Sequence, residues 1–185
     1  LNPLESKKQL DSLRVRKTDK IDAEKLAMSQ FILNRKPSYV QEALYQELRD
    51  LSRFYQNLTE DIVCAKNRLH KVLQITFPEL ENILSAPTGE QYWNLVITFP
   101  CNSFVLESDD ATLTAIIRQS TAKRISEKRV TYLVDKLTKL ANQSYCAVKK
   151  TSPVIEEVKY YAGELLRLSE HRQGVVEEMV TLAQS

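Results

Sequence analysis

The sequence predicts an all-α protein built around a long antiparallel coiled-coil helical hairpin, with a small helical insert at its tip. Apolar residues recur at alternating spacings of four and three in two separate stretches, which is the heptad pattern of helices that pack along a seam. Prolines border both stretches, and the 185 residues include only three glycines. Long uninterrupted helices are therefore expected, with strands nearly absent.

The first long helix is predicted within residues 37–76, between Pro37 and the Pro78 of TFPELE. Pro78 is expected to end this helix, because proline lacks the N–H donor and clashes with the preceding turn. The apolar seam residues of this helix are Leu44, Leu48, Leu51, Tyr55, Leu58, Ile62, Ala65, Leu69 and Val72.

The second long helix is predicted within residues 151–185, where TSPV supplies a start. Ser152 is a suitable N-cap, and Pro153 fits the first helical position because its missing N–H would have no partner there. Only Arg172 interrupts the apolar register. The other seam residues are Val154, Val158, Tyr161, Leu165, Leu168, Val175, Met179 and Leu182.

Residues 77–150, between the two seams, are expected to fold as a helical insert, since a structureless loop of that length is improbable within a domain. DDATLTAIIRQS begins on an Asp cap, and SEKRVTYLVDKLTKLANQSY has apolar residues at helical spacing. EQYWNLVITF is compatible with a helix or a strand, and we interpret it as a helix. The expected core positions are Leu113, Ile116, Ile117, Val130, Leu133, Val134, Leu137 and Leu140.

The two seams can pair in two ways. They can pack against each other within one chain, or each can pack against a second copy. Seams rich in Leu and Tyr with charged flanks also suit pairing between subunits, so a homodimer is a natural hypothesis.

Composition excludes several classes of protein. No apolar run approaches the length of a bilayer span and no secretory signal is recognisable, so we expect a cytoplasmic protein without membrane contact. Three unclustered glycines provide no phosphate-binding loop. Cys64, Cys101 and Cys146 are widely separated and only two histidines accompany them, so no zinc-site spacing exists and buried reduced thiols are expected.

The charge is distributed unevenly along the chain. Residues 7–36 contain nine Lys and Arg against four acids, and residues 118–150 contain nine against two. Residues 77–117 contain six acids and no Lys or Arg. The basic segments are suited to track phosphates, but for either segment alone a solvated helix face is the commoner explanation.

Asp19 and Asp22 are the candidate metal ligands. If TDKIDAEKLAMSQFIL is helical, the two carboxylates lie on one face and can jointly hold Mg2+. The alternative is that Asp19 is an N-cap and that the positive end of the helix dipole favours Asp22. The spacing alone leaves both interpretations open.

The order of NPL at 2–4, KTDKIDAEKLA at 17–27, a long heptad helix and FPELE at 77–81 resembles the DEDD-type transposases of bacterial insertion sequences, a family associated with bridge-RNA-guided recombination. The resemblance implies a RuvC-like catalytic domain in which four acidic residues bind divalent metal. Asp19 and Asp22 correspond to the last two. The first two would lie upstream of Leu1, and a domain with the serine nucleophile would follow Ser185. The chain then resembles an internal fragment, with residues 1–36 as the tail of the catalytic domain.

Two hypotheses from different classes follow. In the first, the chain is the dimerisation and scaffold segment of a transposase that cuts and rejoins DNA with Mg2+, with a guide RNA as a further partner. The isolated chain is then expected to be inactive and to bind no metal. In the second, it is a stand-alone coiled-coil adaptor for a protein partner.

Under the first hypothesis, some side chains are expected near nucleic acid. Tyr92, Trp93 and the other aromatic residues of the insert are able to stack on bases, although core packing is the commoner use of such residues. The expected phosphate contacts are Arg14, Arg16, Lys17, Lys20, Lys123, Arg124, Lys128 and Arg129.

Overall fold

The computed structural model describes residues 23–24, 27–28 and 43–184, and its chain divides into two units, Leu1–Glu42 and Ala43–Ser185. The described residues of the first unit are helical and exposed. The second unit contains the other described residues, 43–184. Within the described residues every regular element is a helix and no strand occurs, which confirms the all-α class.

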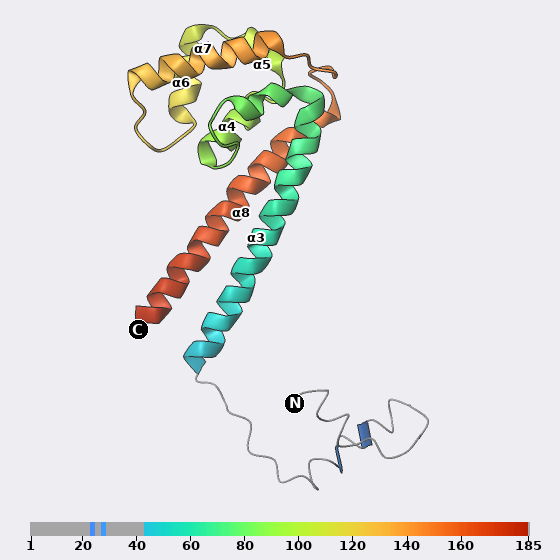
Figure 1. Cartoon of the computed structure of the whole chain (residues 1–185), viewed down its shortest axis with the longest axis vertical. Helices are drawn as coiled ribbons and strands as arrows, with labels where there is room; N and C mark the ends of the chain where they lie inside the picture. The colour runs from blue at the N-terminus through green and yellow to red at the C-terminus, as the bar shows by residue number, and fades with distance from the viewer. Residues whose placement is uncertain (1–22, 25–26, 29–42, 185) are drawn as a thin grey trace. The chain divides into compact units, whose positions relative to one another are not determined.

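Two long helices dominate the second unit. α3 (Ala43–Thr76) and α8 (Pro153–Gln184) run antiparallel side by side, so the two seams meet within one chain (Figure 1). Every predicted seam position is buried or half-buried. Burial is deepest next to the insert, as at Leu69 and Leu165, and shallower towards the free end, where Leu48 and Met179 are half-buried.

The ends of these helices are fixed by local chemistry. Pro153 is the first residue of α8, and the Val154 N–H donates to Ser152 Oγ at 3.4 Å, as expected of an N-cap. α3 ends at Thr76, just ahead of Phe77 and Pro78. The Phe77 N–H still donates to the Leu73 carbonyl at 2.9 Å, which completes the last turn.

The insert contains the short 3-10 helix η1 (Pro78–Asn82) and four α-helices, α4 (Glu90–Thr98), α5 (Asn102–Leu106), α6 (Asp110–Gln119) and α7 (Glu127–Gln143). The interpretation of EQYWNLVITF as a helix is confirmed by α4. α4 packs on α8, while α5 and α6 pack on α7. One buried apolar cluster continues from the seam into the insert, so hairpin and insert share a core.

Polar contacts fix the course of the chain through the insert. Asn102 Nδ2 donates to the carbonyls of Ala141 at 3.1 Å and Ser144 at 2.7 Å, which ties the start of α5 to the end of α7. The Ala147 N–H then donates to the Ile75 carbonyl at 3.1 Å. The returning chain is thereby held against the end of α3, where α8 has to begin.

Candidate functional site

The proposed metal ligands Asp19 and Asp22 lie outside the described residues. So do the four predicted phosphate contacts of the first basic segment, Arg14, Arg16, Lys17 and Lys20. Across residues 43–184 and the four described residues before them, no group of three or more His, Cys, Asp or Glu is placed to hold a metal ion. A search of the same residues finds no helix with the length and apolarity that crossing a bilayer requires.

The second basic segment forms an exposed corner between α6 and α7. We call Lys123, Arg124, Lys128 and Arg129 the basic corner; all four are exposed. Lys123 and Arg124 line a hollow formed by the connecting residues 121–126 and the adjoining helix ends. The structure thus brings together the four insert residues that the sequence nominated.

An ion pair closes the base of this corner. Arg118, in the last turn of α6, donates from Nη2 to Glu127 Oε1 in the first turn of α7 at 2.7 Å. Glu127 is one of only two acids in residues 118–150. Because Arg118 pairs with it, and because no other ion pair forms at the corner within the described part of the chain, Lys123, Arg124 and Lys128 keep an uncompensated positive charge.

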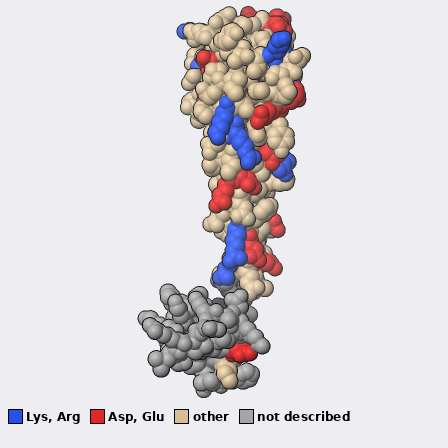
Figure 2. All heavy atoms as spheres, turned by 90° about the vertical axis from the view of Figure 1, so that its right-hand side faces the viewer, with Lys and Arg blue, Asp and Glu red and all other residues tan. Residues whose placement is uncertain are grey.

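The hairpin differs from this corner in its electrostatics. Figure 2 shows Lys and Arg side chains alternating with Asp and Glu along one face of the hairpin. On the helices of the hairpin, some charged side chains form ion pairs, as Lys159 does with Glu156 at 2.8 Å and Arg53 with Asp50 at 3.8 Å. Such exposed pairs contribute little stability, but they cancel the local charge. This face therefore offers a polyanion much less attraction than the basic corner does.

One aromatic residue of the insert lies exposed beside the corner. Tyr132 is 49% exposed on α7. Arg129 Cζ lies 5.2 Å and Lys136 Nζ 5.9 Å from the centre of its ring. The signal was present in the sequence, because Tyr132 falls opposite the apolar positions of the predicted helix.

Tyr92 and Trp93, named from the sequence as able to stack, are instead core residues with 2% and 5% exposure. Burial, followed by the charge of Glu81, raises the pKa of Tyr92 far above its usual range. Core packing is confirmed for both rings.

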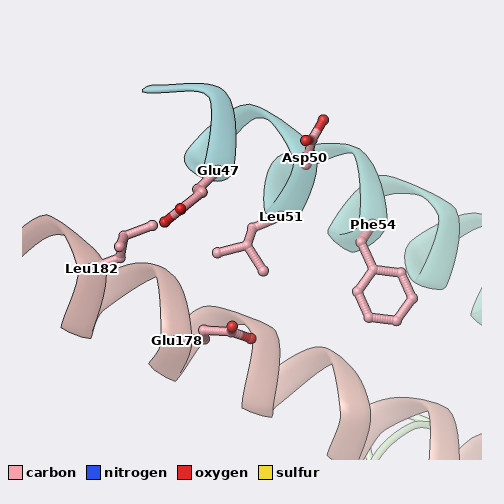
Figure 3. Close-up of a pocket in the computed structure, with 6 residues that line it drawn as sticks. All are labelled: Glu47, Asp50, Leu51, Phe54, Glu178 and Leu182. Carbon is pink, nitrogen blue, oxygen red and sulfur yellow. The ribbon is translucent and has the colours of Figure 1, made fainter. Parts of the chain in front are cut away.

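A groove opens at the free end of the hairpin. Its apolar part is formed by Leu51 and Phe54 of α3 and Leu182 of α8 (Figure 3). Carboxylates line its edges, namely Glu47, Asp50 and Glu178. Phe54 is 47% exposed, so a large ring remains in contact with water. The groove therefore exposes the least covered part of the seam.

The three cysteines are free thiols, but they are not uniformly buried. Cys101 is buried and Cys146 half-buried, whereas Cys64 is exposed because it points away from the seam of α3. The expectation of a buried thiol was wrong for Cys64. Burial, and next the hydrogen bond with Cys101, raise the pKa of Cys146 to about 11.

The comparisons with known proteins locate one match. Residues 1–78 match the model of the DEDD IS110-type family, which is described as a transposase. The matched range contains the Asp19 and Asp22 motif and all of α3, and it ends at Pro78. No curated protein and no solved structure matches the chain.

The cysteine geometry predicts a fixed order of thiol reactivity. At pH 8 a thiol of pKa about 11 is deprotonated in about one molecule in a thousand, so Cys146 should alkylate far more slowly than the exposed Cys64. Mass spectrometry after timed treatment with iodoacetamide measures the order, and Cys64→Ser is the control that removes the fast site. Equal rates at Cys64 and Cys146 would contradict this assignment.

Proposed function

We propose that this chain, whose first 78 residues belong to the IS110-type DEDD transposases, is the dimerisation and scaffold segment of an enzyme that cuts and rejoins DNA. The observation that carries the proposal is the extent of the family match. It runs from the Asp19 and Asp22 motif through the whole of α3, which is one of the two helices of the hairpin. The proposed metal-binding motif and the first helix of the hairpin therefore lie in one continuous matched segment.

In this proposal Asp19 and Asp22 supply oxygen ligands to Mg2+, the donor type that this hard cation prefers. Bound Mg2+ supplies positive charge that stabilises the attacking and leaving oxygens of phosphoryl transfer. Two carboxylates three positions apart fit half of such a site, and the remaining acids would come from other parts of the catalytic domain. The isolated chain is accordingly inactive.

The metal assignment is tested in the intact parent protein. Asp19→Asn or Asp22→Asn should each abolish Mg2+-dependent DNA cleavage, because either change removes a charged ligand. Asp61→Asn, which alters an exposed carboxylate of α3 outside the free-end groove, is the matched control and should retain cleavage. Full activity of both Asn variants would mean that the two acids only cap a helix. An intact protein that does not cleave DNA would favour the alternative function, a stand-alone coiled-coil adaptor.

The scaffold role requires the hairpin to join two copies of the chain. The free-end groove supports this role, since Leu51, Phe54 and Leu182 present apolar surface that a second hairpin would cover. Two hairpins packed there would form a four-helix arrangement and bring two catalytic domains into one assembly.

Light scattering over a concentration series tests the dimer. The chain should have the mass of two copies on dilution, and Phe54→Glu should shift it to one copy because it places a charge in the groove. Val63→Glu is the control, since Val63 is similarly exposed at 51% on the opposite side of α3. A monomer at every concentration would mean that the seams satisfy only each other.

The basic corner, together with Arg14, Arg16, Lys17 and Lys20, is proposed to contact nucleic-acid phosphates. The support is the unpaired charge of Lys123, Arg124 and Lys128 on an exposed surface. If a guide RNA is the partner, base pairing carries the sequence specificity and the protein holds the backbone.

Salt dependence of binding tests this contact. Replacing both Lys123 and Arg124 with Ala should weaken duplex binding and lower the slope of log affinity against log salt by about 0.9 for each lost phosphate contact. Arg53→Ala with Lys159→Ala removes two cations that are paired on the hairpin and should leave the slope unchanged. Binding of the whole chain that is insensitive to salt would rule out the contact.

A further inference from the structure

A row of cations continues from the basic corner along the exposed side of α7. Lys128, Tyr132, Lys136 and Lys139 follow one another at spacings of four, four and three, which places them on one side of the helix. We call these four residues, with Arg129 beside them, the α7 stripe. The opposite side of α7 faces the core through Val130, Leu133, Val134, Leu137 and Ala141.

The charge of this stripe is available to a partner. Within the described residues, Lys128, Lys136 and Lys139 form no ion pair, and Glu127 is already paired with Arg118. Asp135, four positions before Lys139, is the remaining acid on α7 and lies on the same side, so it offsets one charge of the stripe and leaves a net positive row. At a rise of 1.5 Å per residue, Lys128 and Lys139 are about 16 Å apart along the axis, so the row is long enough to follow several phosphates.

Tyr132 lies between the cations of the stripe. Neutralising phosphates requires only the cations, so the exposed ring suggests an additional contact. Tyr132 is 49% exposed, and Arg129 and Lys136 lie against its ring. Exposed cation–π contacts are weak, so an incoming base can replace either cation on the ring. The displaced cation is then free to contact a phosphate.

The strand state of the partner follows from this ring. Bases in a duplex are stacked on one another and paired, so their faces are closed to a side chain. Bases of a single strand are open and stack on aromatic rings between cations that follow the backbone.

We propose that the α7 stripe binds an unpaired stretch of nucleic acid, with Tyr132 stacking on one base and Lys128, Arg129, Lys136 and Lys139 contacting the phosphates on either side. This inference rests on the proposed nucleic-acid contact of the basic corner and adds which strand state it takes. RNA and DNA share the chemistry used here, since both offer base faces and phosphates.

Fluorescence anisotropy with the whole chain tests the stripe, using labelled 20-nucleotide single strands of RNA and of DNA and the DNA duplex of the same sequence. Tyr132→Ala should weaken single-strand binding by about fivefold or more and leave duplex binding unchanged. Tyr132→Phe should restore it, because the ring is kept. Tyr45→Ala removes a ring of similar exposure, 51%, near the start of α3 and should have no effect. Circular dichroism verifies that each variant remains helical.

The outcomes separate this inference from the proposed contact. If the Lys123 and Arg124 double variant weakens binding but Tyr132→Ala weakens neither strand state, or both equally, the stacking role is wrong and the phosphate contact stands. If no nucleic acid binds in a salt-sensitive way, both fail. Competition by polyglutamate as strong as that by single strands would assign the stripe to an acidic protein and overturn the inference. A preference between the RNA and DNA strands identifies which one the stripe takes.

Discussion

The packing of α3 against α8 is the interaction on which the rest of the second unit depends. A single long amphipathic helix has nothing to bury its apolar side against, and helical stability in proteins comes mainly from such packing. Because the two helices share one seam, residues as far apart in the sequence as Leu69 and Leu165 are both buried. The same pairing forces the insert to leave and return at one place, where the Ala147 N–H reaches the Ile75 carbonyl.

The packing of α3 against α8 also determines which side of α7 meets solvent. The core runs without interruption from the seam through the insert, so α7 is held by its apolar side and presents its cations outwards. The ion pair between Arg118 and Glu127 links the end of α6 to the start of α7. It also neutralises a carboxylate that would otherwise lower the positive charge of the basic corner. Ion pairs offset part of the charge on the hairpin, whereas Lys123, Arg124 and Lys128 at the basic corner form no ion pair among the described residues, so the corner attracts a polyanion more strongly.

The family match adds a division along the chain. The matched residues 1–78 contain the carboxylate motif and α3, whereas α4 to α8 lie beyond them. The proposed chemistry therefore rests on the matched segment. The proposed nucleic-acid surface rests on the geometry of the insert alone, which explains why it has to be argued from exposure and charge.

The sequence by itself determined the class of fold, the two seams and the helix ends, because heptad spacing, the proline at 78 and the cap at Ser152 act within a few turns of chain. It also nominated the four residues of the basic corner. Tertiary structure decided the rest. Packing on α8 settled EQYWNLVITF as a helix and buried Trp93, and the pairing of the seams within one chain was open until distant residues met. Periodicity already placed Tyr132 opposite the apolar positions of its helix, but packing decided that Tyr132 and Cys64 are exposed, since exposure depends on which helix faces are covered.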